Sequence, residues 1–550
     1  MSRARSSKLA SPFISRRAVL RGLTFSSLLP LVVGCERPRA KSSLVQLNRG
    51  NGPEFDTLDV HKASTSEAHN VLRDLYECLT RLDKGGNAIP AAAEGWEVAA
   101  DGLFYTITIR SGLRWSNGDP VVAEDFLASF RRLVDPATAA PYAQLVDMLE
   151  GASEIIAGKL PPQALGIESD DPTRLLLKLQ RPAPYLPSIL ANVATAPLHR
   201  ASYAQYGRKF IAPGALVSNG AFTLGEVLTG SHVRLLRNPH FRENARNKID
   251  VVKFLHLADE NAELRAYRAN ELHVTMAVPR SQYDWIKENL AKELHVAPQS
   301  GTYYYGFNLD RAPFADAPGL RRALSLVIDR ERLANSVLRV GELPAYGWIP
   351  PGLPAYTSQT FDYAAHTIEA KIAEAKALYK AAGYSASRPL RFSLSYNAGE
   401  VHNKLAVAVA SMWKAALGVD VALDAVEFRS LLERIERRDV DMYRLAWRGD
   451  YNDPYTFLQA LQSTAPTNSM HFRSAEFDQL LAQGLEASED VDRRRLFENA
   501  ERVLLAQHPL IPLYFYVNKH LVKPTVRGWY NNPLDVLYSH DLSLTDAVGA

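Results

Sequence analysis

Short apolar runs alternate with longer amphipathic stretches along most of this chain, and this alternation limits the possible folds more than any other feature. Runs rich in β-branched and aromatic residues predict strands, and they lie at Phe104–Arg110, Arg174–Gln180, Val251–Leu257, Arg391–Tyr396 and Leu521–Pro524. Apolar residues at helical spacing predict helices, and these lie at Val122–Val134, Gly319–Leu338, Thr367–Gly383, Asn403–Gly418 and Asp490–Gln507. Strands and helices mixed on this scale predict α/β lobes.

Size and charge limit the classes of partner. A chain of 550 residues with 47% apolar and 22% charged residues has room for two or three well-packed domains. Six basic residues and no acidic residue lie in residues 1–34, so 57 basic and 60 acidic residues remain in the rest of the chain. A mature chain with a net charge near −3 gives no reason to expect a nucleic acid as partner.

The N-terminal segment has the pattern of an export signal. The stretch SRRAVLRG (Ser15–Gly22) precedes LTFSSLLPLVVGC (Leu23–Cys35), an apolar segment shorter than the roughly 20 residues that a membrane-spanning helix needs. SRRAVL resembles a twin-arginine signal, and LVVGC resembles a lipobox whose cysteine is lipidated. We expect a lipoprotein signal at residues 1–34, lipidation at Cys35 and a tether at residues 35–44. The alternative is an ordinary cleaved signal with an incidental cysteine.

The second cysteine fits this interpretation. If Cys35 is acylated, only Cys78 is left, so no internal disulfide can form despite export. Stability then has to come from core burial, which a chain of this length can supply. We expect Cys78 to behave as a small buried hydrophobic residue.

The usual catalytic motifs are missing from the sequence. It contains no GxxxxGK[ST] or GxGxxG phosphate loop and no GxSxG nucleophile turn. His61 and His69 stand near Glu67, but without an HExxH motif or a cysteine pair they do not have a metal-binding spacing. The segment Ile349–Tyr356 is a proline-rich connector, and Ser116–Pro120 is a turn. We expect no enzymatic activity, no metal and no cofactor.

Several ordered stretches resemble one protein family nearly from end to end, over about residues 44–545. They are Leu47–Ala63, Arg73–Leu79, Ala93–Phe126, Ser218–Leu224, Thr302–Asn308, Leu320–Arg330, Trp447–Pro454 and Pro512–Pro524. Together they are similar to the large extracytoplasmic solute-binding proteins of ABC importers, family 5, and most of all to the oligopeptide-binding members.

The resemblance implies an α/β fold of the periplasmic-binding-protein type II class, a clamshell of two lobes with an extra domain on one lobe. Lobe I would comprise residues 45–76, 203–302 and 518–545, the extra domain residues 77–202, and lobe II residues 303–517. An extended peptide would lie in the cleft and bond through its backbone like an added strand. The implied partners are short peptides and an ABC permease with its ATPase subunits. We expect a monomer, lipid-anchored in the periplasm or cell envelope.

The stretch WRGDYNDP (Trp447–Pro454) carries the central candidate. Asp450 matches the family's amine-binding aspartate, and a carboxylate there can accept a charge-assisted hydrogen bond from a peptide's α-ammonium group. The alternative is a turn residue, because Asn452, Asp453 and Pro454 have the pattern of a turn that opens the helix Tyr455–Gln462. Since Asp453 can supply the helix cap, Asp450 is left for ligand.

Other positions carry over from the resemblance. Arg444 and His402 match residues toward the carboxylate end of shorter peptides; the alternatives are a strand arginine paired with an acid and a solvated histidine at a helix start. Tyr142, Trp447 and Tyr516 match aromatic residues that flank the peptide, although each is also a plausible core residue. The set of expected ligand-binding residues is Asp450, Trp447, Arg444, His402, Tyr142, Tyr516, Ser66, Ala446 and Arg448.

Departures from the family pattern leave the ligand open. Ser64 and Ser66 stand where closer relatives carry an acid and a valine, Arg448 replaces a small residue, and Ile435 stands where an arginine can contact ligand. A murein peptide, a nickel chelate or an oligosaccharide stays possible, because relatives of this fold bind them. A peptide sensor that feeds no importer would share all these residues, and an exported hydrolase would need a nucleophile or metal set that the sequence does not show.

Overall fold

The computed structural model of this chain describes residues 44–354, 356–487 and 489–545. The predicted export signal, Cys35 and residues 36–43 of the predicted tether lie outside these ranges. In the three ranges, no helix combines the length and the hydrophobicity needed to cross a membrane.

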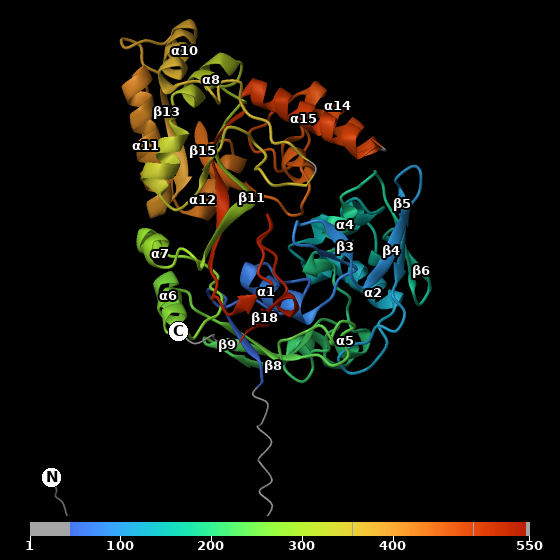
Figure 1. Ribbon diagram of the computed structural model, residues 1–550. Helices are drawn as coiled ribbons and strands as arrows, with labels where there is room; N and C mark the ends of the chain where they lie inside the picture. Colours follow the sequence, from blue (N-terminus) through green and yellow to red (C-terminus); the bar gives the residue numbers. More distant parts are fainter. Residues whose placement is uncertain (1–43, 355, 488, 546–550) are drawn as a thin grey trace, which may run out of the picture. The chain divides into compact units, whose positions relative to one another are not determined.

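A four-stranded sheet joins the start of the described chain to much later segments. It contains β1 (Gln46–Gly50), β8 (Phe222–Leu228), β9 (His232–Arg237) and β10 (Val251–Leu255), in the order β1-β10-β9-β8. β1 and β10 are parallel, and the other pairs are antiparallel. Helix α1 (Ser66–Leu75) lies just above β8 and β9 in Figure 1. Thr65 caps this helix by accepting a hydrogen bond from the backbone N–H of Ala68.

A second, antiparallel sheet is formed by segments between α1 and β8. Its strands are β4 (Ala93–Val98), β5 (Phe104–Ile109), β6 (Ile167–Asp171) and β7 (Arg174–Lys178), in the order β4-β5-β7-β6. Buried and more exposed residues alternate along β5 and β7, as expected when one face of a sheet is covered. Helix α2 (Ala123–Val134) packs against β6 and β7 and buries Phe126 and Phe130.

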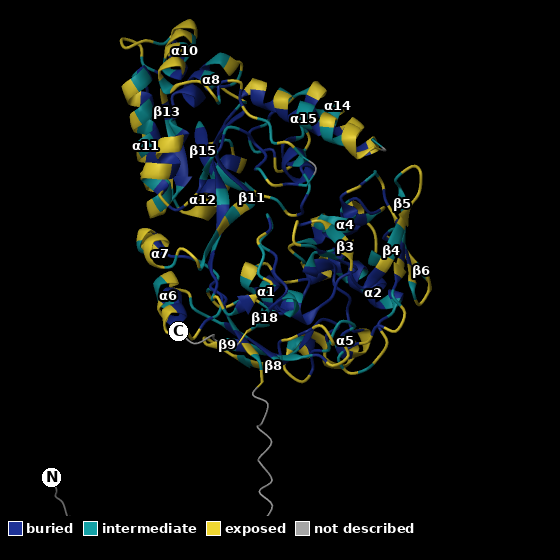
Figure 2. Cartoon of the chain, viewed as in Figure 1, coloured by how far each residue is buried: buried dark blue, intermediate teal, exposed yellow. Residues whose placement is uncertain are grey.

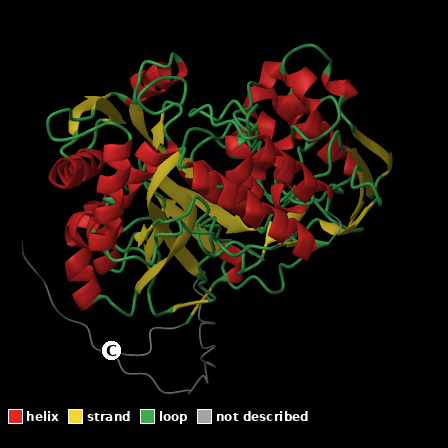
Figure 3. Cartoon of the chain, turned by 90° about the horizontal axis from the view of Figure 1, so that it is seen from above, coloured by secondary structure: helices red, strands yellow, loops and turns green. Residues whose placement is uncertain are grey.

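The third sheet has six strands in the order β12-β16-β11-β15-β13-β14. The strands are β11 (Leu294–Phe307), β12 (Leu343–Pro344), β13 (Arg391–Asn397), β14 (Asp420–Val426), β15 (Met442–Arg448) and β16 (Leu510–Leu521). β13 pairs in parallel with β14 and β15, while β11 lies antiparallel between β15 and β16. Seen from above, long strands run between groups of helices (Figure 3).

Helices accompany the six-stranded sheet. They are α8 (Pro318–Leu326), α10 (Ile368–Ala381), α11 (Glu400–Leu417), α12 (Phe428–Glu436), α13 (Tyr455–Leu458), α14 (Ala475–Glu486) and α15 (Asp490–Gln507). Two of them, α11 and α12, pack against β13. Figure 2 shows exposed residues along α10, α11 and α14, whereas β15 is buried in its first three residues and has one exposed residue, Arg448, at its end. The predicted helices at residues 122–134, 367–383, 403–418 and 490–507 are confirmed within a few residues.

Strands β11 and β16 link the six-stranded sheet to the four-stranded one. Their pairing is irregular between Pro298 and Thr302, so the residues in between leave the regular ladder. Past the end of β16, Val522 forms a bridge with Val274, which in turn bridges Arg49 of β1. The irregular segment therefore lies where the chain passes from one sheet to the other.

Two predicted elements are wrong in extent. The helix predicted at residues 319–338 is divided, because Asp329 accepts a hydrogen bond from the backbone N–H of Arg332 and starts a new turn (Arg330–Arg332) that continues as a π-helix (Leu333–Leu338). Of the strand predicted at residues 521–524, only Leu521 belongs to β16 (Leu510–Leu521), which ends there. The predicted boundaries of the two lobes and the extra domain stay a prediction.

Candidate functional site

The loop that follows β15 holds Asp450 at a fixed position. The backbone N–H of Gly449 donates to the carbonyl of Ser300 (2.8 Å), and that of Asp450 donates to the Thr456 hydroxyl (3.1 Å). Gly449 is needed for this close approach, because a Cβ atom there would lie 2.5 Å from the Ser300 hydroxyl. These two hydrogen bonds therefore fix the backbone that carries the Asp450 side chain.

The two aspartates of this loop have different surroundings. Asp453 accepts a hydrogen bond from the backbone N–H of Tyr455 (2.9 Å) and forms a two-bond ion pair with Arg493 (2.8 Å each). The Asp450 carboxylate has no hydrogen bond or ion pair with any residue that the structure describes. The division expected from the sequence is thus present: Asp453 binds the first turn of α13, and Asp450 is not used by the fold.

Solvent reaches the Asp450 side chain, but the surrounding protein strips part of its hydration. This desolvation disfavours the charged form and raises the pKa of Asp450 to about 6. A carboxylate with restricted hydration and no protein partner is suited to accept a ligand cation. Perturbed carboxylates in clefts are typical of functional sites.

Asp450 lines a cavity of about 220 Å³ that residues from distant parts of the chain enclose; we call it the Asp450 pocket. Its other lining residues are Ser66, His69, Arg73, Leu82, Tyr142, Ser188, Ala191, Asn192, Val193, Gln299, Ser300, Arg448, Gly449, Pro533, Leu534 and Val536. An adjoining pocket of about 200 Å³ shares Ser66, Arg73, Gln299, Arg448 and Leu534 with it. Four predicted ligand-binding residues, Asp450, Arg448, Tyr142 and Ser66, therefore line one cavity.

One face of helix α1 contributes to both pockets. Ser66, His69, Asn70 and Arg73 have the spacing of a single helical stripe and all line one or both cavities. The imidazole of His69 lies 5.3 Å from the ring of Tyr142, measured between centroids. Burial lowers the pKa of His69 to about 4, so His69 is neutral near pH 7.

Tyr142 lies within the electrostatic reach of Asp450. Burial raises the pKa of Tyr142, and the negative charge of Asp450 raises it further, while the Arg73 guanidinium acts in the opposite direction. The Tyr142 hydroxyl is therefore close enough to the negative Asp450 and the positive Arg73 to interact with both charges. This position fits a residue that flanks a bound ligand.

Arg444, His402 and Tyr516 form a second group around Tyr303. The Arg444 guanidinium donates to the Asn397 side-chain oxygen (2.9 Å) and the Tyr516 hydroxyl (3.2 Å), and its carbon lies 4.3 Å from the centre of the Tyr303 ring. The His402 ring lies 3.1 Å from the Tyr303 hydroxyl and is stacked on that tyrosine. Within the described ranges, Arg444 has no carboxylate partner, contrary to the alternative of a paired strand arginine.

His402 is neutral in this group. Burial, reinforced by the positive charges of Arg444 and Arg280, lowers the pKa of His402 to about 4. The alternative, a solvated histidine at a helix start, is only partly correct. His402 lies in the first turn of α11, but its ring is partly buried.

Trp447 and Ala446 are less accessible to a ligand. The Trp447 indole N–H donates to the carbonyl of Thr456 (2.9 Å), so this polar atom is already satisfied. Ala446 stands opposite Tyr303 in the β15–β11 register. Both residues are partly buried, and neither lines the Asp450 pocket or its neighbour.

The remaining departures from the family pattern lie away from these pockets. The Ser64 backbone and hydroxyl both donate to the Asp56 carboxylate (2.7 Å each). Ile435 is buried in the core with 4% of its surface exposed. Only Ser66 and Arg448 of the unusual positions line the pockets.

The described part of the chain has no group of residues arranged to bind a metal and no exposed thiol. No group of three or more His, Cys, Asp or Glu residues there has a geometry that could hold a metal. His61 is instead bound to Ser129 (2.9 Å) and Arg132 (2.5 Å), away from His69. Cys78 is buried, as expected, and burial raises its thiol pKa to about 12.

The lining residues that sequence reasoning missed include His69, Arg73, Gln299 and Ser300. The helical stripe of α1 carried a signal, because Ser66, His69 and Arg73 have the spacing of one face. Gln299 and Ser300 carried none, since their position depends on the irregular pairing of β11 with β16.

Comparison with known proteins agrees with the fold. Residues 87–469 match the bacterial extracellular solute-binding proteins, family 5 Middle. The chain is 36% identical over 500 residues to the periplasmic oligopeptide-binding protein OppA of Escherichia coli (strain K12), covering 90% of this chain and 92% of that protein. It is 36% identical over 489 residues to the periplasmic murein peptide-binding protein MppA of the same organism, with coverages of 88% and 90%.

A solved structure shows the same architecture. The MppA periplasmic murein tripeptide binding protein in its unliganded open form matches with a TM-score of 0.84 at 35% identity, covering 92% of this chain and 98% of that chain. The fold is therefore the two-lobed clamshell expected from the sequence, with mixed helices and sheets. This chain belongs to the bacterial extracellular solute-binding proteins of family 5.

Proposed function

We propose that this protein captures short peptides by their free amino terminus and delivers them to an ABC permease. The observation that carries the proposal is the Asp450 carboxylate, which lines a cavity, has restricted hydration and has no partner in the described chain. The α-ammonium group is the one cation that every free peptide shares at its start, so a fixed carboxylate selects peptides without reading their side chains. The relatives named as oligopeptide-binding and murein peptide-binding proteins support this choice.

The remaining predicted residues have complementary roles in this proposal. Ser66, Tyr142 and Arg448 flank the first peptide residues, since they line the cavity with Asp450. Arg444 of β15, Tyr516 of β16 and His402 of α11 contact the later residues or the terminal carboxylate of a shorter peptide. Trp447 and Ala446 lie on β15 between Arg444 and the Asp450 loop. The peptide backbone adds like a strand, and closure of the lobes buries it.

Calorimetry with a mixed set of di- to pentapeptides tests the proposal, and mass spectrometry of any ligand that co-purifies with the mature protein identifies the natural one. We expect peptides with a free amino terminus to bind and to raise the melting temperature. At a hundredfold excess over Kd, binding adds about 2.7 kcal/mol to the free energy of unfolding. N-acetylated copies should bind poorly. If no peptide of the set binds, or if acetylated copies bind equally well, the proposal is wrong.

A murein peptide is the second candidate, favoured by the 36% identity to MppA. Such a ligand also begins with a free ammonium group, so Asp450 would act in the same way. Competition between a murein tripeptide and an ordinary tripeptide for the purified protein separates the two candidates. A co-purified ligand that contains diaminopimelate would decide for the murein peptide.

The proposed location is the periplasm or cell envelope, with a lipid anchor on Cys35 and export through a twin-arginine-like signal. Changing Arg16 and Arg17 to lysine should block export, and Cys35→Ser should leave an unacylated precursor. One acyl chain gives only marginal membrane attachment, so release into the soluble fraction should depend on how many chains are added. Acylated protein in the Cys35→Ser variant would contradict the lipid anchor.

Transport requires a partner permease, and we propose that the protein works as a monomer with it. Uptake of a labelled peptide by cells that produce the protein, compared with cells that lack it, tests delivery. Binding without any uptake would indicate a peptide sensor. Peptide hydrolysis by the purified protein would instead indicate an exported hydrolase.

A further inference from the structure

We propose that Arg448 and Arg73 form a carboxylate-binding subsite beside Asp450, so that this protein prefers ligands with a carboxylate close to their free ammonium group. This inference rests on the proposed function and adds a ligand preference to it. The preference is carried by two positive side chains that the Asp450 pocket and its neighbour share.

Arg448 is the last residue of β15 and extends into the pocket wall. It is exposed, and its guanidinium carbon lies 4.7 Å from the centre of the Tyr516 ring. Among the residues that the structure describes, no carboxylate lies within ion-pair distance of it. Gly301 pairs with Arg448 in the sheet, and a Cβ there would lie 3.4 Å from Arg448 Cγ and 3.1 Å from the Tyr516 ring. The glycine therefore leaves room for the stem of this arginine.

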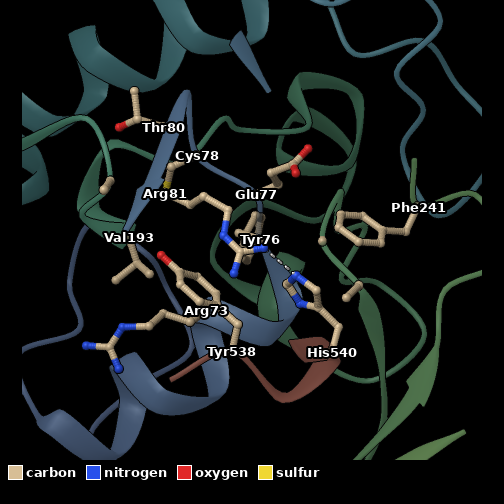
Figure 4. A pocket seen from close by; sticks show the side chains of 13 residues that line it. Arg73, Tyr76, Glu77, Cys78, Thr80, Arg81, Val193, Phe241, Tyr538 and His540 are labelled. Atoms are coloured by element: carbon tan, nitrogen blue, oxygen red, sulfur yellow. Dashed lines mark hydrogen bonds between the residues drawn. The ribbon is translucent and has the colours of Figure 1, made fainter. Parts of the chain in front are cut away.

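Arg73 approaches the same cavity from helix α1. Figure 4 shows its guanidinium pointing away from the group formed by Arg81, Tyr538 and His540. One of its terminal nitrogens donates to the Asn70 side-chain oxygen (2.9 Å), and no carboxylate in the described ranges forms an ion pair with it. Arg73 lines the Asp450 pocket, its neighbour and the small cavity of Figure 4.

The acids nearest to Arg73 are already engaged. Asp535 accepts a hydrogen bond from His520 (2.9 Å). Asp74 accepts one from the backbone N–H of Ser539 (2.9 Å) and lies 3.9 Å from the Arg49 guanidinium. These two acids raise the pKa of Arg73, while the larger effect of burial lowers it. An arginine still keeps its charge at neutral pH.

The pockets therefore hold a fixed excess of positive charge. Arg49 and His520 have acidic partners, and His69 is neutral near pH 7. Asp450, Arg73 and Arg448 are left without an ion-pair partner among the described residues, although Arg73 donates to Asn70 and Arg448 lies over the Tyr516 ring. Once a ligand ammonium neutralises Asp450, closing the cleft over two unpaired guanidinium groups is costly unless the ligand also brings an anion.

A polar neighbour strengthens the case for a carboxylate. Ser300 is buried with 3% of its surface exposed and lines the Asp450 pocket, yet its hydroxyl has no hydrogen-bond partner in the described chain. A hydroxyl donor beside guanidinium groups matches the acceptor oxygens of a carboxylate. Gln299, which lines both pockets, adds side-chain amide donors.

Two sources can supply this carboxylate. One is an acidic side chain in the first residues of a peptide, and the other is the terminal carboxylate of a very short peptide. Both place a negative charge a few bonds from the α-ammonium group. Peptides with an amidated carboxyl terminus separate them, because amidation removes only the terminal charge.

Calorimetry of the full mature protein with matched peptides tests the subsite. The first set compares Ala-Glu-Ala-Ala with Ala-Gln-Ala-Ala, each with a free and an amidated carboxyl terminus, and shifts the glutamate to positions one and three. The second set compares Ala-Ala with Ala-Ala-amide. We expect at least a tenfold preference for glutamate over glutamine at one position, unaffected by amidation, if the side chain supplies the carboxylate. A tenfold loss on amidation of Ala-Ala, without a glutamate preference, assigns the subsite to the terminal carboxylate.

Protein variants test which arginine produces the preference for a ligand carboxylate. Arg448→Gln should remove most of the preference, measured as the ratio of the affinities for the charged and the uncharged peptide, and it should not disturb folding because the side chain is exposed. Arg73→Gln should act in the same direction. Arg473→Gln is the matched control, since Arg473 is exposed and lines neither pocket. If Arg73→Gln does not fold, Arg448→Gln alone decides.

Failure of the subsite differs from failure of the proposed function. If the parent binds charged and uncharged members of both peptide sets equally well, the subsite is wrong and peptide capture stands. A preference that survives in Arg448→Gln and in a folded Arg73→Gln also overturns it. If no peptide binds, peptide capture itself is wrong, and the subsite falls with it.

Discussion

Two carboxylates with raised pKa values, the buried Glu501 in helix α15 and the solvent-exposed Asp450 in the pocket, differ in what surrounds them. Glu501 accepts hydrogen bonds from the backbone N–H groups of Trp348 (2.9 Å) and Ile349 (2.8 Å), and from two further groups nearby, Gln359 N–H (3.1 Å) and the Tyr356 hydroxyl (2.6 Å). Burial raises the pKa of Glu501 to about 7, although these bonds act against the shift.

Asp450 shares the raised pKa but has none of these bonds to the described chain. Glu501 thus completes the fold, because it satisfies the backbone of a proline-rich connector that would otherwise be left with buried donors. Asp450 leaves its carboxylate free for the proposed ligand. The raised pKa is common to both residues, but Glu501 is fully buried and hydrogen-bonded, whereas Asp450 is exposed to solvent and its carboxylate has no partner in the described chain.

The largest expected effect is the loss of peptide affinity in Asp450→Asn. Removing one partner of a desolvated ion pair leaves the other charge uncompensated, which costs about 3 to 5 kcal/mol, or roughly two to four decades of affinity. The unliganded variant should melt within a few degrees of the parent, because Asp450 makes no side-chain bond to the described chain. Calorimetry and thermal melting measure the two quantities.

Two controls accompany this prediction: a modified peptide and a second protein variant. N-acetylated peptides lack the ammonium group, so they should lose little further affinity in Asp450→Asn. Asp439→Asn removes an exposed carboxylate outside both pockets and should leave binding unchanged. Unchanged peptide affinity in Asp450→Asn would reduce Asp450 to a turn residue.

Glu501→Ala should show the opposite profile. It leaves the buried backbone N–H groups of Trp348 and Ile349 and the part-buried N–H of Gln359 without their acceptor. Each unsatisfied buried donor costs roughly 1 to 3 kcal/mol, so we expect about 2 kcal/mol less stability or more. Glu501→Gln keeps one acceptor oxygen and should lose less. Urea unfolding measures the loss, and peptide affinity of the folded fraction should stay within a few fold of the parent.

A large loss of peptide affinity in folded Glu501→Gln would break the comparison, because it would make Glu501 part of the binding machinery. So would an undiminished free energy of unfolding in Glu501→Ala. Either result would mean that the number of hydrogen-bond partners does not distinguish the two roles.

These two residues also show how far the sequence predicts the molecule. The loop of Asp450 lies in a local stretch, Trp447–Pro454, whose turn chemistry and family resemblance are visible in the sequence. The role of Glu501 was not predicted, because its partners come from a connector about 150 residues earlier in the chain. The same holds for Ser300, whose place in the pocket depends on a strand irregularity that no pattern marks.

Secondary structure is likewise predictable where the pattern is local and not where distant contacts decide it. The helices at residues 122–134 and 490–507 have a local period, and the structure confirms them. The helix predicted at residues 319–338 breaks where Arg330 is fully buried and donates to the distant carbonyl of Pro512 (2.9 Å). Tertiary contacts of this kind override helix propensity.

The third expected effect is a dependence of peptide affinity on pH. The pKa of Asp450 in the free protein, about 6, lies above the ordinary 3.8. The folded protein therefore binds a proton more readily than the unfolded chain in this window, and this group's contribution to stability falls as the pH rises through it. A ligand ammonium favours the ionised form, so affinity should be constant above pH 6 and fall about tenfold per unit below it.

Other groups near Asp450 do not produce this midpoint. His69 has its pKa near 4, Tyr142 titrates far above neutrality, and Arg73 and Arg448 stay charged. A peptide ammonium keeps its proton below pH 7. Calorimetry at pH 5, 6 and 7 measures the effect, and Asp450→Asn should abolish it. A parent affinity that does not change from pH 7 to pH 5 would show that Asp450 is ionised throughout or does not meet the ligand.

The smallest expected effect is that of Tyr142→Phe. The hydroxyl lies within the electrostatic reach of Asp450 and Arg73, while the ring is packed beside His69 at 5.3 Å and would stay there. Losing one hydroxyl dipole typically changes a free energy by about 0.5 to 1.5 kcal/mol, so peptide affinity should fall by roughly two- to tenfold. Tyr206→Phe, on an exposed tyrosine outside both pockets, is the matched control. A loss in Tyr142→Phe as large as that of Asp450→Asn would place the tyrosine hydroxyl, rather than the carboxylate, at the centre of ligand recognition.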